Sequence, residues 1–361
     1  MRPTSRSALL LSALLVACSE ATAPRDGAVA SRTPEPALCC GGVATWTPSA
    51  LALPAGTWVE SAARAISDSN IVVGSVSDAT GFHRPVRWNA AGVPSIPAVV
   101  FANYSTFATG INLRGDMVGV TFLKSGNISG IWQPIRWLVG APPLMLATLG
   151  SWGRIDGING ARVAVGSSGA TSGQTHAVTW NAAGAITDIH PAGAIESEAR
   201  GINDAGDIVG AAYLPDGKYH AWKWRANGTQ QDLGIANPLG ALGVNAAGEV
   251  AGTAKFLGGD VAVTWSAASA LTYLVGPSSP SEAFGISDLQ RLVGRHVSGG
   301  WQKPWTMRGT NFVALPTLAT WVGAEAFSVN RCGHAVGTLT TGTATNWTKH
   351  AARWWRSSCD A

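Results

Sequence analysis

Three glutamates stand at the same place in a repeated motif and are the acids best placed to do chemistry. Glu198, Glu282 and Glu325 each precede the Ile or Val of the motif by four residues. If these motif strands line a central channel, the three carboxylates approach one rim, where they could bind a cation, an amine or sugar hydroxyls. A glycan hydrolase or lyase would need two carboxylates roughly 5–10 Å apart. The alternative is that each acid bonds the turns of its neighbours.

Three tryptophans, Trp132, Trp301 and Trp347, lie outside the repeated tryptophan position and are expected in loops between second and third strands. Exposed loop aromatics often bind sugars or proteins, although they could equally pack within the loops. The chain has no HExxH, paired-cysteine zinc spacing, Gly-x-Ser-x-Gly or phosphate-binding loop. We therefore predict no catalytic residue, no metal and no cofactor.

The N-terminus has the pattern of an export signal. Arg2 and Arg6 precede an apolar run that is too short to span a bilayer. The run ends in Leu-Val-Ala followed by Cys18, which resembles the bacterial lipobox, in which the cysteine receives lipid before cleavage. We expect a signal peptide at 1–17, a Pro/Ala/Ser/Thr-rich tether at 18–41 and a folded domain at 42–361. Ser19 favours the outer membrane, with the domain facing the periplasm or the cell surface.

Four further cysteines, Cys39, Cys40, Cys332 and Cys359, predict two disulfides in an exported chain. Three pairings are possible. Cys332 with Cys359 is favoured because both are expected at the same end of the last repeat. The crossed pairings would instead tie the tether to that repeat.

The folded domain contains seven copies of one sequence repeat. Each copy contains a small residue, Ile or Val, Asn or Ser, a turn and then a glycine, and these final glycines are 42 to 47 residues apart. They are Gly74, Gly119, Gly166, Gly210, Gly252, Gly294 and Gly337. Charged residues are only 13% of the 361 residues, Gly numbers 44 and Trp 16. A period in the forties without helical segments is typical of propeller blades.

A second anchor in each copy alternates polar and apolar residues and ends in Trp, as in HAVTW at Trp180, or in Met307 in the sixth copy. This alternation predicts the third of four strands, with one buried face. The tiny residue before each Ile or Val indicates close backbone approach, so we place the first strand innermost. The fold predicted is all-β, a seven-bladed β-propeller of four-stranded antiparallel blades; a capped β-solenoid is the alternative.

The two ends of the domain complement each other. The last copy lacks a fourth strand, and Ala50–Pro54 resembles the fourth strand of the preceding copy, Phe312–Pro316. We expect this N-terminal strand to close the ring, which removes two open sheet edges. Thr45-Trp46 also resembles a third strand, so either it or Trp354 is surplus to a seven-blade count.

The motifs resemble the bacterial extracellular HAF repeats, with the nearest matches at His176–Trp180 and His220–Trp224. The resemblance covers roughly residues 42–356 and implies an exported repeat protein without a defined activity. We expect a lipid-anchored, monomeric binding or interaction module whose ligand is a protein or a glycan. The weak net charge argues against nucleic acid. An envelope glycan hydrolase or lyase, using acids at the channel, is the alternative.

Overall fold

The computed structural model describes residues 44–123, 131–257, 259–274, 276, 280–343 and 346–359, which all belong to one unit. The predicted signal peptide and tether, with Cys18, Cys39 and Cys40, lie outside the described residues. Every regular element in the described part is a β-strand. None of these residues forms a helix that could cross a membrane.

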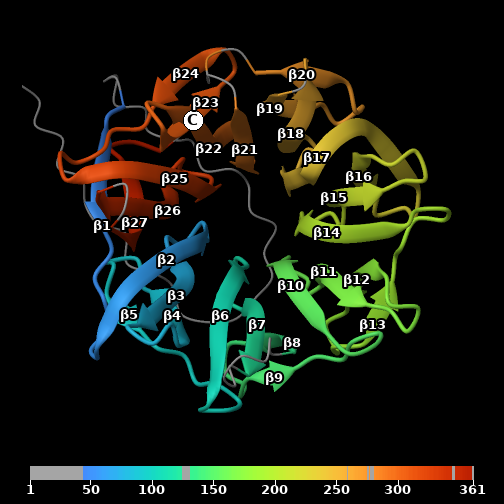
Figure 1. The fold of residues 1–361 in the computed structure, drawn as a ribbon, viewed down its shortest axis with the longest axis horizontal. Coiled ribbons are helices and arrows are strands. Elements are labelled where there is room, and N and C mark those ends of the chain that lie inside the picture. Colours follow the sequence, from blue (N-terminus) through green and yellow to red (C-terminus); the bar gives the residue numbers. More distant parts are fainter. Residues whose placement is uncertain are drawn as a thin grey trace, which may run out of the picture. The chain divides into compact units, whose positions relative to one another are not determined.

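The strands form antiparallel sheets that follow one another along the chain (Figure 1). The first three sheets are β2 (Trp58–Ile66) to β5, β6 (Tyr104–Ile111) to β9, and β10 (Gly153–Ile158) to β13. Their other strands are β3 (Val72–Asp78), β4 (His83–Trp88), β5 (Pro94–Ser95), β7 (Met117–Leu123), β8 (Trp132–Trp137), β9 (Leu144–Met145), β11 (Ala164–Gly169), β12 (Thr175–Trp180) and β13 (Ile186–Asp188).

A larger sheet follows, with seven strands in chain order. They are β14 (Glu196–Ile202), β15 (Ile208–Tyr213), β16 (Tyr219–Trp224), β17 (Gln230–Val244), β18 (Val250–Phe256), β19 (Gly259–Trp265) and β20 (Leu271–Tyr273). The long strand β17 serves two repeats, because its residues up to Ile235 pair with β16 and those from Ala236 pair with β18.

The last two sheets each have four strands, and one of these sheets includes the most N-terminal strand. One sheet holds β21 (Ser281–Ile286), β22 (Arg291–Ser298), β23 (Trp301–Arg308) and β24 (Asn311–Ala314). The other holds β25 (Trp321–Val329), β26 (Ala335–Gly342), β27 (Trp347–Arg356) and, beyond β27, β1 (Trp46–Ala50).

The sheets are arranged around a common axis, with the first strand of each repeat nearest to it (Figure 1). These inner strands contact one another in the order β2, β6, β10, β14, β17, β21 and β25, and β25 contacts β2 again. The innermost position of the first strand is therefore confirmed.

Strand β1 pairs with β27, and its position corrects the sequence prediction. The pairing runs from Trp46 opposite Arg356 to Ala50 opposite Ala352. The strand predicted at Ala50–Pro54 begins and ends four residues later than the observed strand Trp46–Ala50. Trp46 is not a third-strand anchor but the first residue of this fourth strand, half-buried against the core of the last sheet.

The Asn or Ser after each inner strand holds the first turn of its repeat, as predicted. In Asn203, Oδ1 accepts the N–H of Asp207 at 2.8 Å. The amide of the same side chain donates to the carbonyl of Asn245 in the next repeat at 2.8 Å, a contact that the sequence did not reveal. The same donation to the next repeat recurs from Asn112, Asn159, Asn245 and Asn330. These side chains tie neighbouring repeats around the axis.

Close backbone approach restricts side-chain size at two levels of the repeat. A Cβ on Gly201 would lie 2.7 Å from the carbonyl oxygen of Leu242 on the next inner strand, which confirms the close approach predicted there. A Cβ on Gly210, in the Val-Gly pair, would overlap the carbonyl oxygen of Glu198. That carbonyl lies beside a bulge in the first strand, between Ala199 and Gly201.

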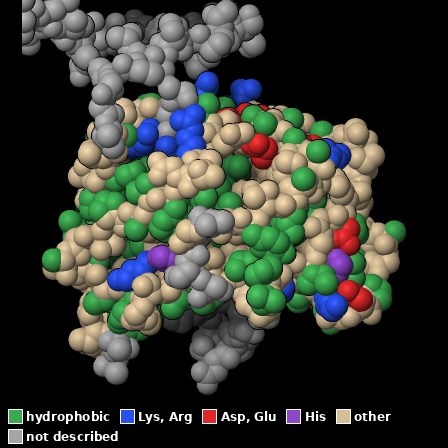
Figure 2. All heavy atoms as spheres, turned by 90° about the horizontal axis from the view of Figure 1, so that it is seen from above, with side chains coloured by type: hydrophobic (Ala, Val, Ile, Leu, Met, Phe, Trp, Pro, Cys, Tyr) green, Lys and Arg blue, Asp and Glu red, His purple; other side chains and the backbone are tan. Residues whose placement is uncertain are grey.

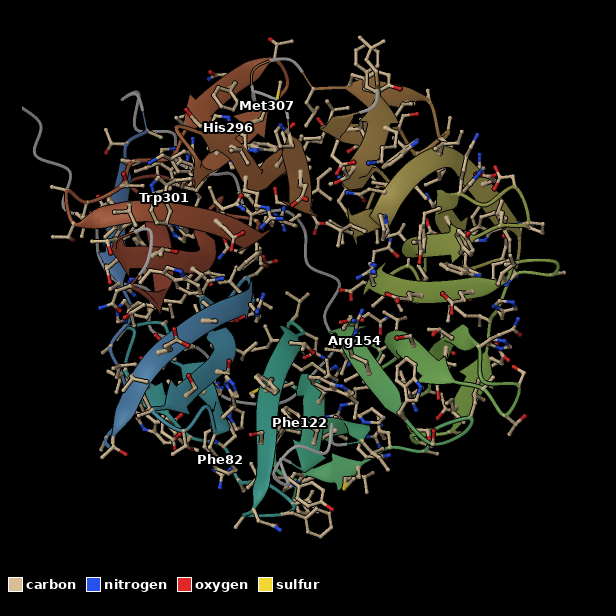
Figure 3. All side chains as sticks on the ribbon, viewed as in Figure 1. Phe82, Phe122, Arg154, His296, Trp301 and Met307 are labelled. Atoms are coloured by element: carbon tan, nitrogen blue, oxygen red, sulfur yellow. A yellow bond between two sulfur atoms is a disulfide. The ribbon has the colours of Figure 1, made fainter. Side chains whose placement is uncertain are left out.

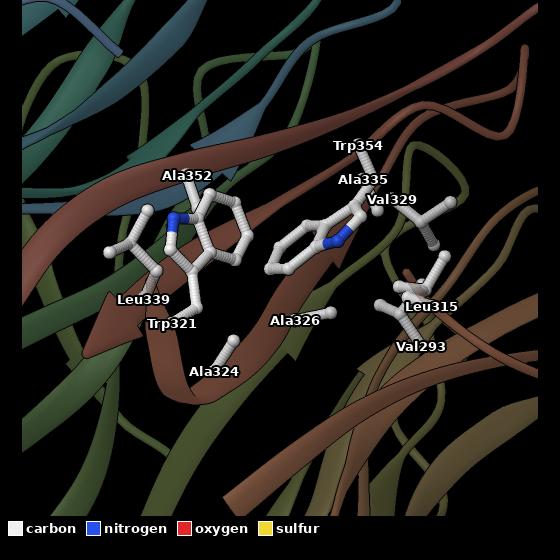
Figure 4. Close-up of a cluster of buried hydrophobic side chains, with 10 residues drawn as sticks. All are labelled: Val293, Leu315, Trp321, Ala324, Ala326, Val329, Ala335, Leu339, Ala352 and Trp354. Atoms are coloured by element: carbon white, nitrogen blue, oxygen red, sulfur yellow. The ribbon is translucent and has the colours of Figure 1, made fainter. Parts of the chain in front are cut away.

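The repeated tryptophans pack between sheets and also donate across the boundary. The indole of Trp180, which is fully buried, donates to the carbonyl of Ala147 at 2.8 Å. Equivalent bonds of 2.6–2.9 Å join Trp88, Trp137, Trp224 and Trp354 to the segment after the fourth strand of the preceding repeat, and Trp265 to Leu233 within β17. Figure 4 shows Trp354 in the core of the last sheet, where it meets Trp321 edge-on at 6.1 Å.

Candidate functional site

The ring has two ends. The turn end carries the turns between first and second strands, which are residues 67–71, 112–116, 159–163, 203–207, 245–249, 287–290 and 330–334. The loop end carries the links between second and third strands. Because Trp46 pairs with Arg356, the last residue of β27, the described chain begins at the turn end. Cys332 and Cys359, which form a disulfide, lie at this end too.

Each inner strand has a bulge two residues before the motif Ile or Val, and the bulged residues line the channel. They are Arg64, Thr109, Asp156, Arg200, Leu242, Phe284 and Phe327. The residues just before them are fully buried in the sheets, whereas these seven are half-buried or exposed. We call them the bulge ring. The three predicted glutamates stand on the same strands, two residues before their bulges.

Glu198 is held between two arginines. Its carboxylate accepts from Arg200 at 2.6 Å and from Arg154 at 3.2 Å, and Arg154 also contacts Asp156 at 3.0 Å. Figure 3 places Arg154 beside the central opening, on β10. The carboxylates of Asp156 and Glu198 raise the pKa of Arg154, with Asp156 acting most strongly. This side of the channel is a balanced network of two cations and two anions.

Glu282 and Glu325 are brought together by one arginine. Arg295, on β22, donates to Glu282 at 2.6 Å and also contacts Glu325 on the adjacent sheet. The three predicted acids are therefore split, because Glu198 belongs to the separate network around Arg154 and Arg200. Each of these acids is therefore occupied by an arginine partner.

A cavity of about 180 Å³ opens at the turn end, lined by the first turns and the motif Ile and Val residues. Asp68, Asp204 and Asp288 lie on its wall. Each accepts a backbone N–H from the preceding repeat, at 2.6–2.8 Å. Burial raises the pKa of Asp68, the Arg331 N–H lowers it, and Asp288 and Asp204 raise it further. These acids join adjacent turns, so they act as structural acceptors.

The three predicted tryptophans do not meet, and they do not lie in loops. Trp132, Trp301 and Trp347 are the first residues of the third strands β8, β23 and β27. Trp132 and Trp347 are 41% and 47% exposed, whereas Trp301 is half-buried and packs near Gly323 of the next sheet. Figure 3 labels Trp301 near the last two sheets, away from Phe122.

Trp132 belongs to an aromatic cluster at the loop end, which we call the aromatic platform. Its ring lies 4.6 Å from Phe122 on β7 and 6.1 Å from Phe107 on β6. His83, from the neighbouring sheet, lies 4.3 Å from Phe107. Ile131 beside Trp132 is 57% exposed. The sequence did not reveal this cluster. The cluster forms from residues on three adjacent strands, whereas the alternation around Trp132 describes one strand only.

The repeated histidines have structural partners. His176 bonds Asp188 at 2.8 Å and His220 bonds Asp232 at 2.8 Å, in each case joining the third strand to the fourth. His176 also stacks on His190 at 3.9 Å. Burial lowers the pKa of His190, and the neighbouring His176 lowers it further, while the Ala194 carbonyl and Asp188 raise it. A cavity of about 350 Å³ lies beside His190 and Asp188, between the third and fourth repeats.

The disulfide joins the predicted pair Cys332 and Cys359, 27 residues apart. His334 lies beside it, with one ligand atom of each residue within 4.8 Å of the others. His334 Nδ1 accepts the Arg356 N–H at 3.0 Å, and the ring stacks on Trp355. A neutral histidine has a single acceptor nitrogen, so this set does not offer the three free donors of a metal site.

Comparison with known proteins identifies the fold. No family model matches the chain, and no curated protein matches it. The β-propeller domain of the Trilobed protease from Pyrococcus furiosus, described as having an open velcro topology, is similar with a TM-score of 0.55 and 8% identity, over 84% of this chain and 98% of that one. The fold is a β-propeller.

Two further propellers align over part of their length. An acylaminoacyl peptidase is similar with a TM-score of 0.51 and 10% identity, over 84% of this chain and 52% of that one. TolB from Acinetobacter baumannii has a TM-score of 0.43 and 12% identity, over 67% of this chain. The present chain spans 62% of that TolB chain. At these identities the similarity extends to the fold alone.

Proposed function

We propose that this protein is a lipid-anchored β-propeller of the bacterial cell envelope that acts as a non-catalytic binding module. The HAF-like repeats, the apolar N-terminal run and Cys18 support export and anchoring at the outer membrane. The bound ligand would be a protein or a glycan. The domain would face the periplasm or the cell surface as a monomer.

The propeller is proposed to have seven blades. The cycle of inner strands and the double role of β17 support this count, since they divide the seven-stranded sheet into two blades. The pairing of β1 with β27 supports closure of the last blade by the N-terminal strand. Closure of this kind removes the free edges of two sheets and ties the two ends of the chain together.

The aromatic platform is the proposed binding surface. The observation that carries this is the tilted contact of Trp132 with Phe122 and Phe107, with Trp132 left 41% exposed at the loop end. Rigid aromatic side chains give a large contact area at low entropic cost, which suits both sugar rings and protein partners. The third strand β8 has six residues and spans roughly 20 Å, so the platform is separated from the turn end, where the described chain begins.

Envelope glycan hydrolysis gains no support from the acids. Glu282 and Glu325 share Arg295, and Glu198 is held by two other arginines. A glycosidase needs one carboxyl group that stays protonated to act as the general acid. All three carboxylates instead accept hydrogen bonds from arginines.

The binding surface is tested with the full chain carrying Cys18→Ala, which removes the acylation site. This protein is applied to a glycan array and to immobilised envelope fractions, alone and with Trp132→Ala added. We expect the Cys18→Ala protein to be retained on the array or on the envelope fractions. Adding Trp132→Ala should abolish this retention, and adding Trp347→Ala should leave it unchanged. Trp347 is the matched control because it is as exposed as Trp132 but has no aromatic partner among the described residues. Equal retention by both variants contradicts the proposed surface.

The anchor is tested by fractionation. The unaltered chain should sediment with membranes, and Cys18→Ala should be recovered in the soluble fraction, because stable anchoring requires the acyl chains. Retention of Cys18→Ala in the membrane fraction contradicts lipid anchoring.

A further inference from the structure

The bulge ring is divided into a polar arc and an apolar arc. Thr109, Asp156 and Arg200 stand on consecutive inner strands, followed by Leu242, Phe284 and Phe327 on the next three. Arg64, on β2, completes the circle beside Phe327. The apolar arc therefore has an arginine at each end.

The two flanking arginines differ in their partners. Arg200 is paired with a carboxylate, since its Nη2 donates to Glu198 at 2.6 Å and to the Pro238 carbonyl at 3.1 Å. Arg64 has no hydrogen-bond acceptor and no carboxylate within ion-pair distance among the described residues. Its guanidinium lies over the ring of Phe327, 4.9 Å from the centroid. Arg154 and Arg295 in the same channel both have carboxylate partners.

The surroundings of Arg64 combine apolar rings with access to water. Phe327 meets Phe284 edge-on at 5.2 Å, so the two rings form one wall of the channel. Arg64 is exposed to solvent, yet the surrounding protein lowers its pKa by burial, and the Glu325 carboxylate opposes this only in part. A guanidinium with free donors in a partly enclosed site binds an anion more strongly than one on an open surface.

We propose that Arg64, Phe327, Phe284 and Leu242 form a site in the channel for a carboxylate attached to an apolar group. The guanidinium would bind the carboxylate through two parallel hydrogen bonds, and the rings would contact the apolar part. Glu282 and Glu325 lie near the site and repel a dianion more than a monoanion, so a carboxylate is favoured over phosphate. Such a group occurs at the C-terminal residue of a peptide and in small aromatic or aliphatic acids.

The site is tested with 4-fluorobenzoate, whose binding to the Cys18→Ala full chain is followed by ¹⁹F NMR. We expect saturable line broadening. Arg64→Gln should weaken the affinity for the probe at least tenfold, and Arg64→Lys should weaken that affinity less. Phe327→Leu should also weaken it. Arg87→Gln is the control, because it removes an arginine charge from β4 without touching the channel. Circular dichroism and melting temperature establish that each variant is folded.

Competition distinguishes the two sources of the carboxylate. A short peptide ending in a free Phe carboxylate displaces the probe if a chain terminus fits the channel, whereas the amidated peptide and inorganic phosphate should not. Displacement by benzoate but by neither peptide would assign the site to small acids. No broadening at millimolar probe, or equal broadening with Arg64→Gln, overturns the proposal. Trp132→Ala should leave this binding unchanged, which separates the channel site from the aromatic platform.

Discussion

The indole bonds between neighbouring sheets predict a large loss of stability for a conservative change. In Trp180→Phe the aromatic ring remains, but the N–H that reaches Ala147 is lost. Trp180 is completely buried, whereas its acceptor residue Ala147 is exposed. The change isolates the boundary between the second and third sheets, because Ala147 and Trp180 belong to different repeats.

The expected cost has two parts. Leaving the Ala147 carbonyl without its donor costs about 1 kcal/mol or slightly more. Removing the second ring of the indole from a packed core costs about 2 kcal/mol, since the site cannot fully collapse. The sum is about 3 kcal/mol, which for a domain of this size corresponds to a decrease in melting temperature of about 5 °C.

The assay is thermal and urea unfolding followed by far-UV circular dichroism, which does not depend on tryptophan emission. Trp347→Phe is the matched control, because Trp347 is 47% exposed and has no indole acceptor among the described residues. We expect the control to change the free energy of unfolding by less than about 0.5 kcal/mol. A Trp180→Phe protein that unfolds at the same temperature as the unaltered chain would refute the stabilising role of these bonds.

Three further predictions follow from buried polar groups. Asp116→Asn should destabilise the fold by about 2–3 kcal/mol in urea unfolding, because the carboxylate is fully buried and accepts from Arg162; an effect below about 0.5 kcal/mol would contradict this. Asn203→Ala, which removes both a turn bond and a bond to the next repeat, should cost about 2 kcal/mol, whereas the exposed Asn227→Ala should cost little. Burial lowers the pKa of His190, so the unfolded chain takes up a proton first as the pH falls below about 6.5. The melting temperature should therefore decrease from pH 7.5 to 5.5, and His190→Gln should reduce that decrease.

The repeating plan of the fold was predictable because each repeat carries local signals. Asn203 and its equivalents begin turns by accepting backbone N–H groups a few residues ahead, which is a property of the residue itself. The alternation before Trp180 marks a strand with one buried face, and the small residues such as Gly201 mark close contact of backbones. These signals do not require knowledge of distant residues.

The register of the N-terminal strand was predicted wrongly for an identifiable reason. Ala-Leu occurs twice in succession, at Ala50-Leu51 and Ala52-Leu53. The two choices differ by two residues and so place the same face inward. The structure selects the first, because the Leu51 N–H donates to the Ala351 carbonyl at 2.8 Å, as Leu315 does to Pro304 at 3.0 Å.

The site chemistry could not be predicted because it depends on contacts between repeats. Arg295 lies 13 residues from Glu282 and 30 from Glu325, and no motif links the three. The bulges that expose Arg64 and Phe327 to the channel are indicated in the sequence only indirectly, by the glycine of each Val-Gly pair. The sixth repeat differs from the others, because Met307 stands at the position of the repeated tryptophan. Trp305, two residues earlier, fills the core instead, and its indole N–H has no acceptor among the described residues.

Closure of the ring by the N-terminal strand is tested most directly by hydrogen exchange, measured by mass spectrometry on peptides covering 44–52 and 350–358. Because β1 pairs with β27 over Trp46–Ala50, both peptides should be protected to a similar degree and should lose protection together in urea. Exchange of the N-terminal peptide within seconds, while the β27 peptide stays protected, would contradict a propeller closed by β1.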